Sequence, residues 1–288
     1  MEVCTCATTR RAASLGSRLA VRRADPELHA AVLAWYDRAG RGLPWRRTRD
    51  PYAILVSEVM AQQTQVARVM PYYERWMDRW PTVAALAHAA AADVLRAWVG
   101  LGYNLRALRL HAAALIVARD GWPRDAAGLR ALPGVGDYTA AAVASFAFGE
   151  RIAAVDTNVR RVAGRIGLEP SELLPSQRHA DWNQAAMELG ATICTARVPH
   201  CETCPAAPWC DSRGLPAMAP PRAGGRPAGR FEDSDRWVRG RIVAALAAGQ
   251  DLPAGIEPAR LGRALEALER DGLVQRSGTG VGLPRRPR

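Results

Sequence analysis

Two carboxylates in this sequence lie in surroundings that favour opposite protonation states. Asp50 and Pro51 predict the start of a helix, on which Glu58 is the only acid before Glu74. The immediate neighbours of Glu58 are apolar, and burial disfavours the charged form of a carboxyl group. We therefore expect a raised pKa for Glu58 and a protonated side chain near neutral pH. The alternative, from this segment alone, is a glutamate on a solvated helix face.

Asp156 follows the apolar run 152–155 and precedes a helical segment. The simplest role for an aspartate at this position is to cap the helix. The positive end of the helix dipole lies at the same place and favours the anionic form. One neutral acid and one fixed anion are the pair that glycoside cleavage uses. The acid protonates the leaving group, and the anion stabilises the cationic sugar.

Four cysteines, Cys194, Cys201, Cys204 and Cys210, have the spacing C-x6-C-x2-C-x5-C. Four soft thiolates so close together suit one metal centre, and the spacing favours an iron–sulfur cluster. Structural zinc remains the alternative, although only one close C-x2-C pair is present. Disulfides are disfavoured because nothing in the sequence directs the chain to an oxidising compartment.

The segment Leu132-Pro133-Gly134-Val135-Gly136 separates two helical stretches and predicts a tight hairpin. Two glycines allow the turn and expose backbone N–H groups, and the next helix presents its N-terminus. Such a hairpin can bind a DNA phosphate without a side-chain charge. An ordinary helix–helix turn is the alternative.

The composition favours a polyanionic partner and excludes one kind of chemistry. The net charge is +11 and the pI about 10.2, which points to nucleic acid first and a membrane surface second. No apolar run approaches the roughly 18 residues of a membrane span. All 39 basic residues are arginine. With no lysine, the chain has no side-chain amine for Schiff-base chemistry.

The apolar periodicity is helical almost throughout from Pro26 to about Cys194, and it predicts an all-α domain. A Pro/Gly-rich stretch over 214–229 predicts a linker, and a small winged-helix-like module follows. In that module we expect strands at 273–276 and 281–284, joined by a turn at 278–280. The expected helices are 27–39, 51–63, 64–79, 92–100, 105–119, 138–148, 157–166, 178–192, 235–248 and 258–270.

Six segments, in this order, resemble the motifs of the helix-hairpin-helix DNA glycosylases that carry a [4Fe–4S] cluster, the endonuclease III superfamily. Among these, the MutY-type adenine DNA glycosylases are the most similar. The segments are Leu43–Arg46, Ser57–Val66, Gly100–Tyr103, the hairpin Leu132–Gly136, Val155–Val159 and the cysteine cluster. The resemblance spans about residues 29–210.

The resemblance implies a domain organisation. It places a helix-hairpin-helix glycosylase core at 26–213, with a six-helix barrel part at about 50–155. The cluster part combines about 26–49 with 156–213. A basic extension over 1–25, which contains Cys4 and Cys6, precedes this core. A linker at 214–230 and the module at 231–288 follow it.

The resemblance also implies roles for the catalytic residues. Glu58 is similar to the acid that protonates adenine N7, and Asp156 to the carboxylate that stabilises or transiently bonds the sugar C1′. Tyr138 and Asn158 resemble residues that assist at the catalytic centre. Tyr138 lies where endonuclease III-like enzymes carry a nucleophilic lysine. The resemblance therefore implies a monofunctional enzyme that releases the base with water and does not cut the strand.

Further residues resemble the family's DNA-binding and cluster-binding positions. Gln63 and Tyr103 are similar to side chains that wedge into the duplex as the base leaves the stack, although core or surface roles are the alternative. The hairpin is similar to the phosphate-binding element, and the four cysteines to the ligands of the [4Fe–4S] cluster. Ala61, Asn104 and Asp137 depart from the family pattern, and Asp137 puts an acid where the hairpin usually has a base.

The implied substrate is double-stranded DNA with adenine mispaired with 8-oxoguanine or guanine. The implied enzyme is a monomer in the bacterial cytoplasm, associated with the nucleoid and not with a membrane. Many members read 8-oxoguanine with a C-terminal Nudix-like domain, which the winged-helix-like segment does not resemble, so the preferred opposite base stays open. Alternatives are a thymine glycosylase for G·T mismatches, which the Gln62–Val66 segment disfavours, a non-catalytic DNA-binding iron–sulfur regulator, and a zinc-stabilised structural protein.

Overall fold

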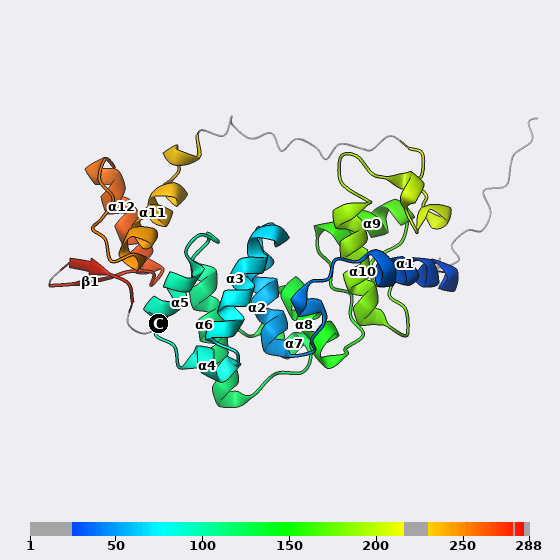
Figure 1. Cartoon of the computed structure of the whole chain (residues 1–288), viewed down its shortest axis with the longest axis horizontal. Helices are drawn as coiled ribbons and strands as arrows, with labels where there is room; N and C mark the ends of the chain where they lie inside the picture. The colour runs from blue at the N-terminus through cyan, green and yellow to red at the C-terminus, as the bar shows by residue number, and fades with distance from the viewer. Residues whose placement is uncertain (1–24, 216–229, 279, 285–288) are drawn as a thin grey trace, which may run out of the picture.

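The computed structural model describes residues 25–215, 230–278 and 280–284, and these are mostly helical (Figure 1). Residues 1–24 of the predicted extension, with Cys4 and Cys6, lie outside the described residues, as do most of the predicted linker and Thr279 of the predicted turn. The helices are α1 (Pro26–Ala39), η1 (Pro44–Arg46), α2 (Pro51–Ala61), α3 (Val66–Arg79), α4 (Val83–Ala87), α5 (Ala91–Trp98), α6 (Leu105–Asp120), α7 (Ala126–Arg130), α8 (Asp137–Phe148), α9 (Thr157–Ile166), α10 (His179–Thr192), η2 (Cys201–Thr203), η3 (Ala207–Trp209), η4 (Phe231–Asp233), α11 (Asp235–Ala247) and α12 (Pro258–Arg270).

A first apolar core lies between helices α2 to α8, in the middle of the molecule in Figure 1. Its largest fully buried side chains are Trp76, Trp98 and Tyr52. The polar atoms of these rings are paired, because Trp76 donates to the Tyr52 hydroxyl at 3.1 Å and that hydroxyl donates to the Trp80 carbonyl at 2.9 Å. Buried polar groups are stable only when paired in this way.

A second apolar core joins the start of the described chain to its later helices. Leu28 and Val32 of α1 pack with Val162 of α9 and with Trp182 and Leu189 of α10. Helix α1 therefore lies beside α10, at the end of the molecule opposite the C-terminal module (Figure 1). The cysteine segment continues this core, since Cys194 and Cys204 pack against it.

The C-terminal module consists of α11, α12 and two short antiparallel strands, β1 (Gln275–Ser277) and β2 (Gly280–Gly282), with Arg276 opposite Val281. Its apolar side chains belong to the first core, and α11 packs against α5. The two helices and the ribbon confirm the winged-helix-like expectation. The strands are shorter than predicted, and the residues that flank them, Leu273, Val274 and Leu283, are buried in the first core.

Most predicted helices begin and end within two residues of the observed ones, and among the α-helices of the described residues two short ones were not predicted. Helix α2 ends at Ala61 and α3 begins at Val66, so Gln63 lies in the break between them. The unpredicted helices are α4 and α7, each of five residues. Within the three described ranges, no helix is long and apolar enough to cross a membrane.

Candidate active site and cysteine pocket

A pocket of about 890 Å³ contains all four residues predicted to be catalytic. Glu58 comes from α2 and Tyr138 from α8, on the side of the first core. Asp156 and Asn158 come from the start of α9, on the side of the second core. The two carboxylates therefore face one cavity, and the predicted wedge residue Gln63 lies at the same pocket.

The environment of Glu58 raises its pKa to about 7. The largest cause is burial, interaction with the Tyr138 hydroxyl opposes it, and the negative charge of Asp156 adds to the rise. Burial also raises the pKa of Tyr138 well above its usual value, so its phenol stays neutral. An acid with a pKa near the working pH is suited to proton transfer.

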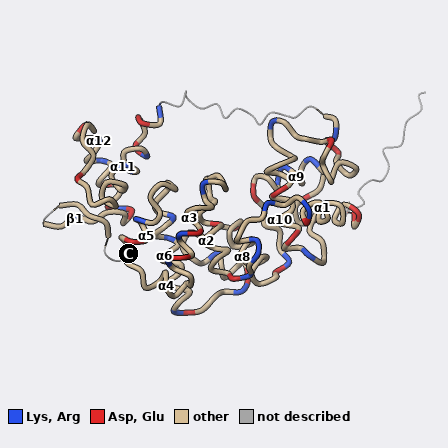
Figure 2. Tube along the Cα trace, in the orientation of Figure 1, with Lys and Arg blue, Asp and Glu red and all other residues tan. Residues whose placement is uncertain are grey.

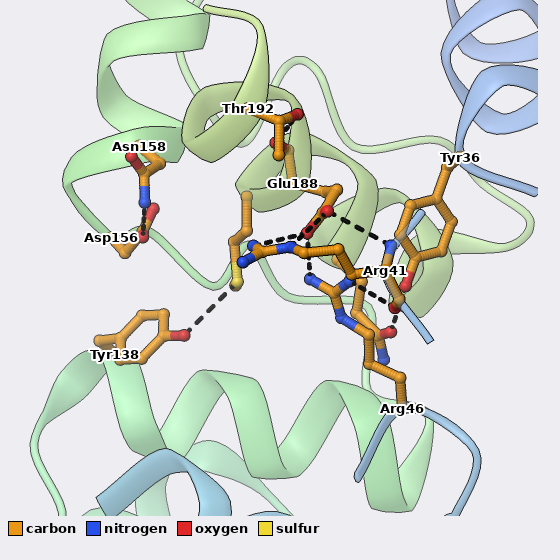
Figure 3. A network of polar contacts seen from close by, with 10 residues as sticks. Tyr36, Arg41, Arg46, Tyr138, Asp156, Asn158, Glu188 and Thr192 are labelled. Carbon is orange, nitrogen blue, oxygen red and sulfur yellow. Dashed lines mark hydrogen bonds and ion pairs between the residues drawn. The ribbon is translucent and has the colours of Figure 1, made fainter. Parts of the chain in front are cut away.

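Asp156 is the N-cap of α9, and both of its carboxylate oxygens accept hydrogen bonds. Oδ1 accepts from the Val159 backbone N–H at 2.7 Å, and Oδ2 from the Asn158 amide at 2.8 Å. Figure 3 shows Asn158 and Asp156 together on one side of the site, across from Tyr138. The carboxylate is therefore fixed in place by its own helix, as the capping pattern predicted.

Asn158 is itself held by a side chain that the sequence did not single out. Arg161 donates to the Asn158 Oδ1 at 2.7 Å, to the Gly190 carbonyl at 2.6 Å and to the Cys194 carbonyl at 2.8 Å. The Arg161 guanidinium thus connects the catalytic pocket, helix α10 and Cys194, the first of the four predicted ligands. Two of its three partners are backbone carbonyls, which leave no signal in a sequence.

An ion-pair network around a buried glutamate lies beside the pocket, whose lining includes Arg41 and Arg46 (Figure 3). Glu188 of α10 is only 1% exposed, and it accepts from Arg41 at 2.7 Å and from Arg46 at 2.8 Å. Burial alone would raise the pKa of Glu188, but the hydrogen bonds and charges of the two arginines lower it. This network ties α10 to the segment between α1 and α2, and Arg46 is the only member within a predicted motif.

The two predicted wedge residues share an unusual backbone conformation. Gln63 and Tyr103 have φ values of 54° and 48°, in the left-handed region that residues other than glycine rarely adopt. Arg106 joins their loops, because it donates to the Gln62 carbonyl at 2.7 Å and to the Gly102 carbonyl at 3.1 Å. Tyr103 is 40% exposed. Strained residues held at a surface in this way are frequent at functional sites.

The predicted hairpin connects α7 to α8. Gly134 has a φ of 79°, and a Cβ there would lie 2.8 Å from the Cβ of Arg109, so glycine is required. The side chains of Leu132 and Val135 are buried in the first core. Only their backbone can face DNA. Gly136 caps α8 without a side chain, which leaves the N–H groups of the first turn available.

Asp137, the acid at the position where the hairpin of this family usually has a base, has an ion-pair partner. Asp137 forms an ion pair with Arg130 at 2.9 Å, although both side chains are largely exposed. This pairing offsets the negative charge next to the N-terminus of α8.

The four predicted ligands line a second pocket, of about 680 Å³. All four are free thiols. Arg165 donates to the Cys194 Sγ at 3.2 Å and accepts, through its carbonyl, from the Cys210 thiol at 3.3 Å. In the part of the chain that the structure describes, no three His, Cys, Asp or Glu side chains are arranged to hold a single metal ion.

Comparison with known proteins identifies relatives over most of this chain. Residues 56–184 match the family model of the HhH-GPD superfamily base excision DNA repair proteins. The adenine DNA glycosylase of Mycobacterium tuberculosis strain H37Rv is 45% identical, over 85% of this chain and 90% of that protein. The enzyme of Mycolicibacterium smegmatis is 43% identical, over 86% and 93%. The human adenine DNA glycosylase is 46% identical over 64% of this chain and 39% of its own length.

Solved structures with the same fold include two kinds of glycosylase. A thermostable thymine-DNA glycosylase superimposes with a TM-score of 0.59 and 30% identity, over 63% of this chain and 92% of that one. A non-covalent complex of endonuclease III with DNA gives a TM-score of 0.54 and 25% identity, over 64% and 91%. These structures confirm the predicted helix-hairpin-helix architecture.

Proposed function

Because this chain belongs to the HhH-GPD superfamily of base excision repair proteins, and within it to the adenine DNA glycosylases, we propose how its pocket releases adenine and from which mispairs. The substrate is adenine opposite 8-oxoguanine or guanine in double-stranded DNA. The enzyme acts as a monomer, in the bacterial cytoplasm at the nucleoid. The observation that supports this mechanism best is the single pocket shared by Glu58 and Asp156, with a Glu58 pKa of about 7.

Glu58 acts as the general acid. Its proton goes to N7 of the extruded adenine while the bond between C1′ and N9 breaks, and the electron pair of that bond leaves with the base. A proton on N7 makes the base a better leaving group. The Glu58 carboxylate that remains then accepts a proton from the attacking water, which adds its oxygen to C1′ and leaves an abasic site.

Asp156 stabilises the positive charge that develops on the sugar. Its two hydrogen bonds from Val159 and Asn158 hold the carboxylate in place before the reaction, so little reorganisation is needed as charge appears. Tyr138, neutral because of its raised pKa, contributes an uncharged hydroxyl beside Glu58. With no lysine in the chain, strand cleavage through a Schiff base has no side-chain nucleophile.

Gln63 and Tyr103 enter the duplex when adenine leaves the stack. Their loops are held together by Arg106, and Gln63 lies at the pocket that receives the base. The hairpin binds a phosphate through the backbone N–H groups at the start of α8. Figure 2 shows arginine along the whole length of the molecule, interspersed with acidic residues, so general phosphate attraction is spread over several elements.

The cysteine pocket holds a [4Fe–4S] cluster. Four free thiols line one pocket, and their spacing, with a single close C-x2-C pair, favours a cluster over structural zinc. When bound, the cluster crosslinks the segment from Cys194 to Cys210. Arg165 brings positive charge to the Cys194 sulfur. A visible absorption spectrum and iron and zinc analysis of the purified protein separate the two metals.

The direct test is base release from defined duplexes. Purified protein is incubated with DNA containing A opposite 8-oxoguanine, A opposite G, or T opposite G, and abasic sites are then cleaved in alkali. We expect release from the two adenine duplexes and none from T opposite G. Release of thymine alone would instead assign the activity of the structurally similar thymine glycosylase.

The acid assignment has its own test. Glu58→Gln removes the proton donor but keeps the size of the side chain, so we expect adenine release to stop while binding to the mismatched duplex is retained. Unchanged release by this variant would overturn the role of Glu58.

A further inference from the structure

The C-terminal module touches a predicted wedge residue. Arg236, in the first turn of α11, donates from Nη1 to the Tyr103 hydroxyl at 2.7 Å. Its guanidinium carbon also lies 4.1 Å from the centre of the Tyr103 ring, and 5.4 Å from that of Phe231. A cation within about 6 Å of an aromatic ring is attracted by the ring's quadrupole. Arg236 therefore holds both the ring and the hydroxyl of Tyr103.

Tyr103 receives a second cation from its own domain. The Arg106 guanidinium lies 5.6 Å from the centre of the same ring, and its other contacts fix the loop on which Tyr103 lies. The loop is strained, since Tyr103 has a φ of 48°. The Tyr103 side chain is 40% exposed, so the two arginines contact a ring that is not enclosed by the core. Arg106 fixes the backbone, and Arg236 fixes the ring.

The element that carries Arg236 is itself rigidly attached. Val238 and Ile242 of α11 are fully buried in the first core, together with the side chains of α5. Arg260 of α12 donates to the carbonyls of Glu232 at 2.8 Å and Ser234 at 2.9 Å, which fixes the start of α11. Figure 1 shows α11 beside α5, the helix that precedes the Tyr103 loop. Arg236 is thus held at a defined position.

We propose that Arg236 is a positioning residue for Tyr103, and that the C-terminal module serves to orient this wedge before DNA binds. The inference rests on the proposed role of Tyr103 in base extrusion. Extruding a base costs a few kcal/mol. A ring already held in its working direction loses less conformational freedom when it enters the duplex, so the extruded state is reached more often.

The experiment compares two arginines on the same helix. Arg236→Ala removes the contacts to Tyr103. Arg241→Ala is the matched control, because Arg241 is exposed and its guanidinium lies over the Trp237 ring of its own helix, at 5.1 Å, and not over Tyr103. Base extrusion is followed by the fluorescence of 2-aminopurine placed at the target adenine. Adenine release is measured in single-turnover reactions at saturating duplex with A opposite 8-oxoguanine.

We expect Arg236→Ala to lower the extrusion signal and the saturating release rate by about tenfold, with an unchanged melting temperature. Arg241→Ala should leave both unchanged. In a Tyr103→Ala background, Arg236→Ala should have no further effect, because coupled residues are not additive. Arg236→Lys keeps the charge but not the planar stacking group, so it should restore only part of the rate.

Three outcomes would overturn the proposal. If Arg236→Ala weakens DNA binding but leaves the saturating rate unchanged, Arg236 is a phosphate contact. If Arg236→Ala matches Arg241→Ala while Tyr103→Ala slows extrusion, the wedge role stands and the positioning role fails. If Tyr103→Ala itself has no effect while the enzyme still releases adenine, the wedge assignment fails and the positioning role fails with it.

Discussion

Burial keeps Glu58 protonated, as a general acid must be before the reaction. The same burial destabilises the carboxylate that Glu58 becomes once it has given up its proton. Its protonation could be anticipated from the sequence, because apolar neighbours and a helix start are local signals. The position of Asp156 could be anticipated from the capping pattern. The roles of Arg161 and Arg106 could not be anticipated, because most of their partners are backbone carbonyls, up to 33 and 47 positions away. Such contacts exist only once the chain has folded.

The pH dependence of adenine release follows from Glu58. With a pKa of about 7, the protonated fraction falls as the pH rises through 7. We expect the single-turnover rate at saturating DNA to decrease about tenfold per pH unit well above 7. A rate that stays constant from pH 6 to 9 would contradict the acid role.

The stability of the Glu58→Gln variant should change with pH in a defined direction. The folded-state pKa, about 7, is higher than the ordinary value of 4.5, so folding favours the protonated form. Below pH 4.5 this carboxyl is neutral in both states and costs nothing. As the pH rises from 4.5 through 7, the wild-type protein loses stability relative to the variant, by up to about 3 kcal/mol. Denaturant unfolding of both proteins at pH 5 and pH 8 measures this difference, and an equal gap at both values would contradict it.

At the scale of the elements, helices α2, α8 and α9 place the predicted catalytic residues around one pocket. Most helices were predicted within two residues, since each has several turns of apolar periodicity. Helices α4 and α7 were missed because five residues are too few to show a period, although their capping residues Thr82 and Asp125 were available signals. The contact between α9 and α10 could not be predicted, because it depends on the close approach of Gly190, in the last turn of α10, to Asn158.

Gly190→Ala should damage the site through its neighbour Asn158, although Gly190 is not itself one of the predicted catalytic residues. A Cβ at Gly190 would lie 2.6 Å from the Asn158 Cβ, so α10 would push the start of α9 away from the pocket. We expect a loss of about 1–3 kcal/mol of stability and a reduced release rate. Gly240→Ala in α11 is the control, because a Cβ added at Gly240 would meet no atom within 4 Å. That change should be neutral or slightly stabilising. Equal effects of the two substitutions would contradict the close-packing argument.

At the scale of the whole molecule, the catalytic pocket lies between two apolar cores, one on the Glu58 side and one on the Asp156 side. The sequence indicated an all-α fold and the cysteine cluster. It did not indicate that the C-terminal module and helices α2 to α8 share one apolar core. The Pro/Gly-rich stretch predicted a linker between two separate domains. The composition of a linker does not indicate whether the domains on its two sides pack against each other.

Loss of the proposed [4Fe–4S] cluster should affect the half with α1, α9 and α10 more than the half with α2 to α8. Cys204→Ser is expected to lower the iron content and to loosen α9 and α10, which adjoin the cysteine segment. Hydrogen exchange should show lost protection in α1, α9 and α10, with α2 to α8 close to wild type. Adenine release should fall because Asp156 depends on α9. Equal loss of protection in both halves would contradict this division.

Helix α1 packs against α9 and α10, which are made more than a hundred residues later. During synthesis on the ribosome, the α2–α8 helices can close around their tryptophans while α1 still has no partner. The Asp156 half is completed only when the segment through Cys210 has emerged. A nascent chain therefore places Glu58 in a folded half long before Asp156 is fixed, and under the proposed mechanism a product truncated before Cys210 would lack one of the two carboxylates in its working position.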